Sequence, residues 1–382
     1  MNIYLDHNAT SPLDPRVLDA MLPWLQGTQG NPSSVHRFGR TAHAAMETAR
    51  RQVAALINVE ASQVIFTSGG TEANNLALEG ICSGLPRGHL LISAVEHAAV
   101  QGPADMLAAD GWQVQRIPVD ATGKVNAGAT EALLRDTTKL VSVMLANNET
   151  GVVQDVRTIA GSAHAHAALM HTDAVQAAGK MPVDFAALDV DLMTLSAHKL
   201  NGPRGVGALI VGKTLPLVAQ ITGGGQEQGR RSGTENLAGI IGFGKAAELA
   251  VEELGRRAAH LRSLREQFEQ GLTTLPGISV FAQTAERLPN TVQIAVSGFD
   301  GEATVMELDR HGIAVSSGSA CQSGNGRPSH VLKAMGFDDV TARSAVRISF
   351  GMSNTSTDVD KLLASLQHIL KSRQTQARAL AW

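Results

Sequence analysis

Residues 192–214 read LMTLSAHKLNGPRGVGALIVGKT, and this stretch carries the pattern from which the fold is predicted. Two apolar runs of strand length, 192–195 and 207–211, enclose a polar stretch that begins with SAHK at 196–199. Short apolar runs bounded by glycine, proline and polar residues are typical of buried β-strands. The stretch therefore predicts two strands, with Lys199 just beyond the carboxyl end of the first.

Further runs of the same kind lie earlier in the chain, at 64–66, 90–93, 114–118, 140–145 and 169–171. Longer alanine-rich segments separate most of them. Strands that alternate with helices form a mostly parallel sheet covered by helices. The sequence thus predicts an α/β fold built on a mostly parallel seven-stranded sheet.

A second region follows the last of these strands. A helix-patterned stretch runs from about 234 to 275 and ends at Pro276-Gly277. Beyond it we expect a strand at 291–296, a helix at 302–310, a Gly/Ser loop, a helix from Ser329, a strand at 346–350 and a last helix from Thr357. This order predicts a smaller α+β domain.

The composition excludes several classes of protein. The 382 residues are 43% hydrophobic and 18% charged, which is ordinary globular usage. Lys and Arg total 32 against 35 Asp and Glu, so no basic surface is predicted for nucleic acid or a membrane. The two cysteines, Cys82 and Cys321, are too few for a disulfide framework, and we find no signal peptide or membrane-spanning run. We expect a soluble, cytoplasmic protein.

Two glycine motifs match nucleotide-binding patterns by their letters alone. Residues 207–214 satisfy the phosphate-loop pattern, but the four middle residues are apolar and Pro216 would break the helix that must follow. We interpret this segment as a buried strand that ends in a turn. Residues 242–247 resemble a dinucleotide fingerprint but lie in a helical pattern, where small residues favour close helix packing.

Three histidines, His164, His166 and His171, could suggest a metal site. Positions two apart on a helix face different sides, however, so the first two cannot converge on one ion. We expect solvated histidines and no metal.

A second set of residues converges on one chemistry. Residues 68–72 (SGGTE) follow a predicted strand and open a helix, which is a setting for phosphate binding, although a plain turn explains them equally well. Asp173, Gln176 and Lys199 follow other strands, and the carboxyl ends of such strands bind ligands in open α/β sheets. A Schiff-base lysine, an acid for a pyridinium nitrogen and a helix N-terminus for a phosphate would need this ensemble.

The ordered string of motifs resembles the cysteine desulfurases of the NifS/IscS type, in the class V aminotransferase family, from residue 3 to about 370. The motifs are YLDHNAT at 4–10, GNPSS at 30–34, SGGTE at 68–72, EH at 96–97, NNETG at 147–151, HTDAVQ at 171–176, HK at 198–199, RSGTEN at 231–236 and SSGSAC at 316–321.

The resemblance implies a fold and an assembly. The fold would be aspartate-aminotransferase-like, which is fold type I of pyridoxal-phosphate enzymes, in a homodimer. Residues 1–14 would form an arm that contributes to the small domain, 15–255 the large cofactor-binding domain, and 256–382 the small domain that carries the Cys321 loop.

The resemblance also implies residue roles at pyridoxal 5'-phosphate. Lys199 would be the Schiff-base lysine, Asp173 would pair with the ring nitrogen, Gln176 would bond the ring hydroxyl and His97 would stack on the ring and move protons. The phosphate would be bound by Gly70, Thr71, Ser196 and His198, and by Thr234 from the partner subunit. Asn148 would lie at the cofactor or substrate, and Arg347 would clamp the substrate carboxylate.

Cys321 would attack the sulfur of L-cysteine, so that L-alanine leaves and a persulfide remains for an acceptor such as an iron-sulfur scaffold or a sulfur carrier. The polar, glycine-rich sequence around it favours an exposed thiol, whereas Cys82 lies in a helix pattern and is expected to pack in the core. Gln322 and Arg327 depart from the residues usual in the family, so the acceptor surface would differ.

Two alternatives stay open from the sequence. An aminotransferase or selenocysteine lyase would share Lys199 and Asp173 but would have no use for a mobile Cys321. A nucleotide-binding protein that uses 207–214 is the alternative from another class.

Overall fold

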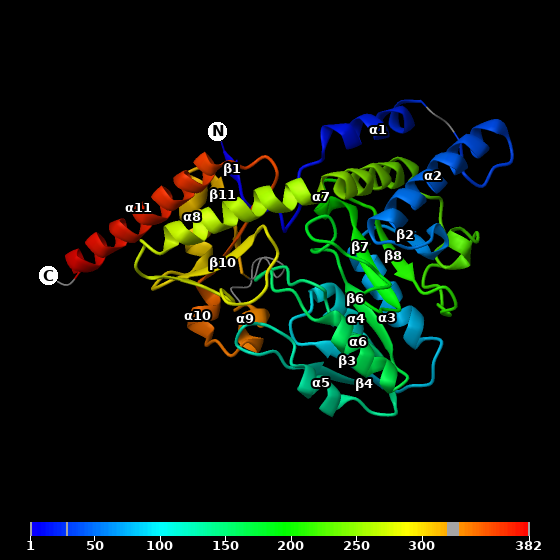
Figure 1. Ribbon diagram of the computed structural model, residues 1–382, viewed down its shortest axis with the longest axis horizontal. Coiled ribbons are helices and arrows are strands. Elements are labelled where there is room, and N and C mark those ends of the chain that lie inside the picture. Colours follow the sequence, from blue (N-terminus) through cyan, green and yellow to red (C-terminus); the bar gives the residue numbers. More distant parts are fainter. Residues whose placement is uncertain (1, 28–29, 319–327, 381–382) are drawn as a thin grey trace.

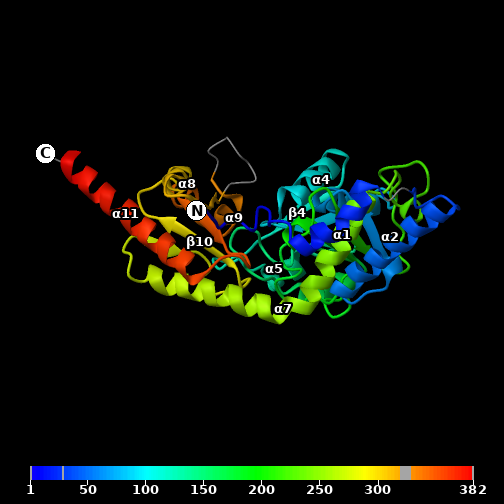
Figure 2. The same ribbon diagram turned by 90° about the horizontal axis from the view of Figure 1, so that it is seen from above.

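The computed structural model describes residues 2–27, 30–318 and 328–380. A larger part built on one sheet and a smaller part built on another are joined by the long helix α7, Leu237–Leu272 (Figure 1). Seen from above, α7 runs along one side of both parts, and α11 projects at the end of the smaller one (Figure 2). No helix in the described part of the chain is both long and apolar enough to cross a membrane.

The larger part contains a seven-stranded sheet in the order β2-β8-β7-β6-β5-β3-β4. Its strands are β2 (Val64–Thr67), β3 (His89–Ser93), β4 (Gln113–Ile117), β5 (Thr138–Ser142), β6 (Leu169–Asp173), β7 (Leu192–Ser196) and β8 (Gly207–Val211). Strand β8 runs antiparallel to both of its neighbours, and the remaining pairs are parallel. The predicted mostly parallel seven-stranded sheet is confirmed.

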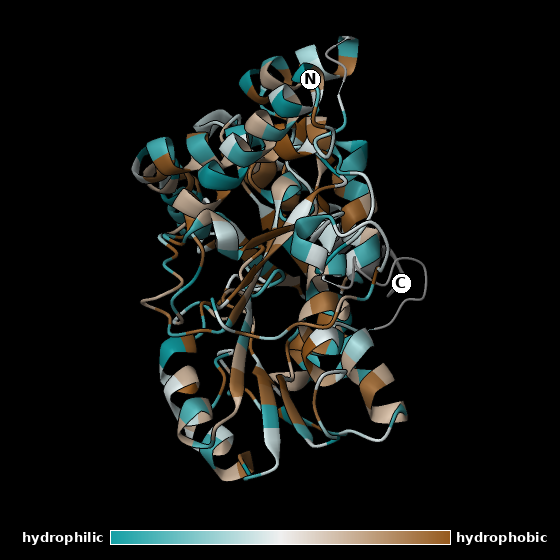
Figure 3. Ribbon diagram, turned by 90° about the vertical axis from the view of Figure 1, so that its right-hand side faces the viewer, coloured by the Kyte–Doolittle hydropathy of each residue, from teal (hydrophilic) through white to brown (hydrophobic). Residues whose placement is uncertain are grey.

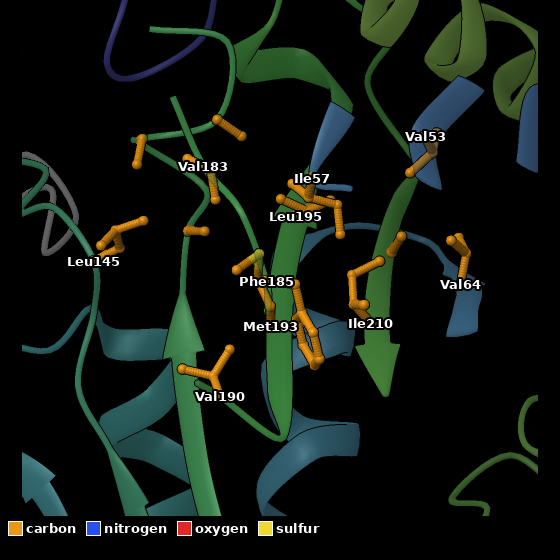
Figure 4. Close-up of a cluster of buried hydrophobic side chains, with 14 of the residues drawn as sticks. Val53, Ile57, Val64, Leu145, Val183, Phe185, Val190, Met193, Leu195 and Ile210 are labelled. Atoms are coloured by element: carbon orange, nitrogen blue, oxygen red, sulfur yellow. The ribbon is translucent and has the colours of Figure 1, made fainter. Parts of the chain in front are cut away.

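Helices cover both faces of this sheet because its central strands are apolar on both faces. On β8, Ala208 and Ile210 pack into one core, and Leu209 between them packs into the other. Figure 4 shows the first core, in which side chains from β2, β7 and β8 meet those of neighbouring helices and loops. The helices of this part are α1 (Pro15–Gln26), α2 (Arg37–Leu56), α3 (Gly70–Cys82), α4 (Ala98–Ala109), α5 (Ala127–Leu133) and α6 (Val156–Ala165), with short 3-10 helices η1 (Ala61–Gln63), η2 (Ala197–Lys199) and η3 (Glu227–Gly229). In the hydropathy view the strands are mostly brown, while the helices around them carry teal segments (Figure 3).

The smaller part is an α+β arrangement, as expected. Its antiparallel sheet has the order β12-β13-β10-β9 and is accompanied by helices. Its strands are β9 (Ile278–Val280), β10 (Thr291–Val296), β12 (Ser316–Ser317) and β13 (Ala345–Ser349), and its helices are α8 (Gly301–Arg310), α9 (His330–Ala334), α10 (Asp339–Arg343) and α11 (Ser356–Leu380). Strand β1 (Ile3–Tyr4) pairs with β11 (Ile313–Ala314), which ties the N-terminal segment to this part.

Helix α7 is continuous through the expected domain division at residues 255 and 256. Phe243 packs in the core of the large sheet, whereas Phe268 packs in the core of the small one. The exact division stays a prediction. Gly242 and Gly244 lie within this helix, and a Cβ at Gly244 would lie 2.6 Å from the Cα of Ala49 on α2. The interpretation of these glycines as helix-packing residues is confirmed.

Residues 207–211 form β8 and are buried throughout, so the interpretation of this segment as a strand is confirmed. The prediction for His171 is wrong. Its ring is completely buried on β6 between Ser142 Oγ, 2.8 Å from Nδ1, and Thr194 Oγ1, 3.1 Å from Nε2. Hydroxyls on the neighbouring strands form hydrogen bonds with both ring nitrogens, and these bonds offset the cost of burying a polar ring. His164 is exposed, as expected, and pairs with Asp191, and no cluster of metal ligands occurs among the described residues.

Candidate active site

One cavity of about 320 Å³ opens at the carboxyl ends of the large sheet's strands. It brings together ten residues that were predicted from the sequence: Gly70, Thr71, His97, Asn148, Asp173, Gln176, Ser196, His198, Lys199 and Arg347. Its other lining residues are Asn8, Ala9, Asn74, Ala99, Met144 and Val175. Thr234 lines a separate depression beside Arg231, and Cys321, Gln322 and Arg327 lie outside the described residues.

Asp173 is the last residue of β6, and two donors hold its carboxylate. Asn74 Nδ2 on α3 donates to Oδ2 at 2.7 Å, and the backbone N–H of Val175 donates to Oδ1 at 2.9 Å. These two hydrogen bonds fix the orientation of the carboxylate. Because Asp173 also lines the cavity, it offers a fixed negative charge to a ligand there.

Lys199 lies in η2, directly after β7, and its amine reaches the N-terminal segment. Its Nζ donates to the carbonyl oxygen of Asn8 at 2.5 Å and to that of Ala9 at 2.7 Å. Gln176 Nε2 donates to the same oxygen of Asn8 at 3.0 Å. Residues 8 and 9 therefore hold two of the predicted cofactor residues in place, a role that sequence reasoning missed although both belong to the quoted motif at 4–10.

The start of α3 forms one end of the cavity. A helix N-terminus offers backbone N–H groups and the positive end of the helix dipole. A Cβ on Gly70 would lie 3.1 Å from Val175 Cγ2 and 3.5 Å from Ser196 Cβ, so a larger side chain would narrow the space. His198 faces this end, and burial lowers its pKa to about 4, so its imidazole is neutral at pH 7. This donor set fits a phosphate ester.

His97 lies at the N-cap of α4 and lines the cavity. Its Nδ1 accepts a hydrogen bond from the backbone N–H of Ala99 at 3.1 Å. Burial lowers its pKa, and the positive charges of Lys199 and Arg347 act in the same direction. The neutral ring therefore carries its proton on Nε2, from which it can donate a hydrogen bond.

Arg347 extends from β13 of the smaller part into the cavity. Its side chain is 3% exposed; Nη2 donates to Asp6 Oδ1 at 2.7 Å and Nη1 donates to the carbonyl oxygen of Asn148 at 3.1 Å. Its Nε has no hydrogen-bond partner in the described part of the chain. A guanidinium with donors to spare suits a carboxylate ligand.

A buried acid precedes His97. Glu96 is completely buried and accepts from Ser93 Oγ at 2.5 Å and from the backbone N–H of Met144 at 2.7 Å, while its Oε2 has no partner among the described residues. Burial raises its pKa to about 8, so this side chain is protonated at pH 7.

The arrangement fits pyridoxal phosphate. A helix start with Ser196 and His198 suits a phosphate, and the Asp173 carboxylate suits a protonated ring nitrogen across the same cavity. Lys199 lines the same cavity.

The sequence and the fold are similar to those of known proteins. Residues 3–362 match the family described as Aminotransferase class-V. The curated cysteine desulfurase of Cereibacter sphaeroides is 47% identical, over 99% of this chain and 97% of its own, and that of Sinorhizobium fredii is 46% identical over 97% and 96%. Among solved structures, a NifS-like protein gives a TM-score of 0.92 at 38% identity, covering 97% of this chain and all of its own. SspA in complex with cysteine gives 0.81 at 32% identity, covering 92% of this chain and 100% of its own.

Proposed function

We propose roles for the pocket residues from one premise: the chain belongs to the class-V aminotransferase family and is an L-cysteine desulfurase that depends on pyridoxal phosphate. The family, fold, activity and cofactor expected from the sequence are thereby confirmed. The competing nucleotide site at 207–214 has no support, because that strand is buried in the sheet. The bound cofactor supplies an electron sink for the α-carbon of the substrate.

Lys199 is the amine that holds the cofactor and then moves the α-proton of cysteine. The observation that carries this role is the cavity itself, in which the Lys199 amine, the Asp173 carboxylate and the start of α3 surround one space. Asp173 keeps the ring nitrogen protonated, because its negative charge stabilises the proton on that nitrogen. Hydrogen bonds from Asn74 and from the backbone N–H of Val175 hold the carboxylate in place for this role. His97, neutral and with its Nε2 proton available, lies against the ring and exchanges protons.

The substrate carboxylate binds to Arg347. This guanidinium is positioned by Asp6 and by the backbone of Asn148, and both contacts leave donors for a ligand. Asn148 itself lines the cavity near the cofactor and substrate. Gly70, Thr71, Ser196 and His198 bind the phosphate, and Gln176 donates to the ring hydroxyl.

Cys321 receives the sulfur. In that step the C–S bond of cysteine breaks and its electron pair stays on the β-carbon, which takes up a proton, while the sulfur forms an S–S bond with the Cys321 thiolate. L-alanine leaves after the α-carbon regains its proton. The other thiol is unsuitable, because Cys82 is buried on α3 and burial raises its pKa to about 12. A thiol that stays protonated is neither a nucleophile nor a leaving group at pH 7.

The assembly and the sulfur acceptor complete the proposal. The protein acts as a homodimer in the cytoplasm, and Thr234, which lies outside the cavity of its own chain, reaches the phosphate of the neighbouring subunit. The large domain spans 15–255 and binds the cofactor. An iron-sulfur scaffold or sulfur-carrier protein takes the persulfide sulfur.

The test uses the two cysteines as a matched pair. Cys321→Ser should bind the cofactor and cysteine, because those contacts use Lys199, Asp173 and Arg347, but should release almost no alanine. Cys82→Ser should stay near wild type, since its side chain only packs. Mass spectrometry after turnover should find the added sulfur on the Cys321 peptide. Added sulfur on Cys82, or wild-type alanine release by Cys321→Ser, would show a different enzyme of this fold.

A further inference from the structure

Lys180 is a buried lysine that lies just behind the cofactor cavity without lining it. It is 7% exposed, and no salt bridge joins it to a carboxylate among the described residues. Its Nζ donates to Gln176 Oε1 at 2.8 Å and to Asn8 Oδ1 at 3.1 Å. Burying an amine with only amide oxygens as partners is unfavourable. We therefore look for the role of Lys180 in the side chains that it contacts.

The contact with Gln176 determines which way that amide points. A carboxamide has an acceptor end, its oxygen, and a donor end, its NH₂ group, and the two ends have nearly the same shape. A charged lysine amine has only donors. The amine of Lys180 donates here to two oxygens. The Gln176 oxygen is therefore turned toward Lys180, and its Nε2 is turned toward the carbonyl oxygen of Asn8, which it reaches at 3.0 Å. One hydrogen on Nε2 remains beyond this bond.

The second restraint on Gln176 is shared. The carbonyl oxygen of Asn8 that receives Nε2 also receives Lys199 Nζ at 2.5 Å. The Asn8 oxygen is thus shared between two donors, whereas the hydrogen bond from Lys180 is made to the Gln176 oxygen itself. Asn8 depends on Lys180 less, because its Oδ1 also accepts from Asn290 Nδ2 at 3.0 Å.

We propose that Lys180 is a positioning residue that fixes the amide of Gln176 with its N–H, and not its oxygen, directed at the cofactor ring. This inference rests on the proposed function of Gln176 as a donor to the ring hydroxyl. An ionised ring hydroxyl can only accept, so a reversed amide would set two oxygens against each other. Burial, together with the charges of Lys199 and Arg347, lowers the pKa of Lys180 well below its usual value. A neutral amine could also accept, but Nζ here lies against two amide oxygens, Gln176 Oε1 and Asn8 Oδ1, and so acts as a donor to both.

The experiment measures cofactor affinity and folding separately. Apoprotein is titrated with pyridoxal phosphate and followed by visible absorbance, and its urea midpoint is measured in parallel. Lys180→Met keeps the length of the side chain and removes the donor. We expect its Kd for the cofactor to rise about tenfold while the urea midpoint does not fall, because an amine no longer has to be buried. Lys213→Met, at an exposed lysine paired with Glu60, is the control and should change neither quantity.

A double-mutant cycle shows whether Lys180 acts through Gln176. Gln176→Ala alone should raise the Kd about tenfold, and the variant with both changes should show about the same rise and not about a hundredfold rise. If the two effects multiply, Lys180 acts elsewhere and the proposal is overturned. It is also overturned if Gln176→Ala weakens binding but Lys180→Met does not.

An unchanged Kd for Gln176→Ala would instead remove the proposed role of Gln176, so the two failures are distinguishable. If Lys180→Met does not fold, Lys180→Arg decides the matter. Arginine keeps donors and should retain the wild-type Kd to within a few-fold. A tenfold loss in that variant would count against the proposal.

Discussion

Asp173 illustrates how single residues of this site obtain their chemistry from distant parts of the chain. Its carboxylate is fixed by the side chain of Asn74, 99 positions earlier, and by the backbone of Val175. Both oxygens are therefore acceptors in a fixed plane, and the charge is directed into the cavity. A carboxylate held in this way stabilises a proton on a facing ring nitrogen.

Asp173→Asn tests this role. The amide oxygen can still accept from the Val175 N–H, but its NH₂ group then faces the Asn74 amide, donor against donor, and the negative charge is lost. We expect alanine release to slow about tenfold or more, since opposite-charge effects of this kind are typically worth one to a few kcal/mol. Cofactor content by absorbance should remain, and Asp105→Asn, in a surface ion pair with Arg116, serves as the control. Wild-type turnover in Asp173→Asn would defeat the role of the charge.

The residues that sequence reasoning missed share a physical reason. Nine of the ten predicted pocket residues follow strands or belong to family motifs, and Arg347, which lies within β13, was predicted from the family resemblance. Asn74 and Asp6 act on other side chains, and a hydrogen bond across 99 or 341 positions leaves no periodic pattern. Lys180 lies only four positions after Gln176, but nothing in the sequence shows that its amine is buried. One signal was present for Asn74, which lies one helical turn beyond Thr71 and is polar in a buried part of α3.

At the scale of elements, β8 supports the turn that precedes α3. A Cβ on Gly207 would lie 2.6 Å from the carbonyl carbon of Gly69 and 2.7 Å from the carbonyl oxygen of Leu195. Both neighbours are backbone atoms that cannot rotate away. The glycine that begins the false phosphate-loop pattern is thus needed for packing against the segment that leads into α3.

Gly207→Ala should accordingly disturb both stability and cofactor binding. Forcing a methyl group into a packed site costs about 1–3 kcal/mol, and the displaced turn would move Gly70 away from the phosphate position. Gly212→Ala, at the other end of β8, is a matched control, because its Cβ would meet nothing closer than 3.5 Å. We expect it to stay within about 0.5 kcal/mol of wild type in urea unfolding. Equal effects of the two changes would contradict the close packing of β8 on the turn.

The strands could be predicted from short-range patterns of apolar and polar residues in the sequence. Each predicted strand is present, because apolar runs between breakers identify strands. Most of them are buried on both faces, whereas β4, at the edge of the large sheet, is partly exposed. The solvated interpretation of His171 failed for the same reason. A polar residue inside such a run is buried with its neighbours, and its partners Ser142 and Thr194 lie on adjacent strands that a single sequence does not align.

At the scale of the whole molecule, buried titratable groups give stability a pH dependence with two signs. Burial lowers the pKa of His171 to about 3 and that of His7 to about 4, so the unfolded chain binds protons near pH 6 that the folded chain does not. These groups lower stability as the pH falls below about 6.5. Glu96 acts in the opposite sense: burial raises its pKa to about 8, the folded chain keeps a proton that the unfolded chain loses, and stability falls as the pH rises above about 4.5.

A histidine variant isolates one of these contributions from the sum. For His171, the loss between pH 6.5 and 5 is about 2 kcal/mol, because each pH unit inside the window between the unfolded and folded pKa values changes stability by about 1.4 kcal/mol. His171→Gln keeps a polar side chain between Ser142 and Thr194 but cannot take up the proton. We expect its free energy of unfolding in urea to decline by about 2 kcal/mol less than that of wild type over this range, whatever its stability at pH 8. His43→Gln, at an exposed position on α2, should follow the wild-type curve. Parallel curves for wild type and His171→Gln would mean that His171 already takes up its proton in the folded protein.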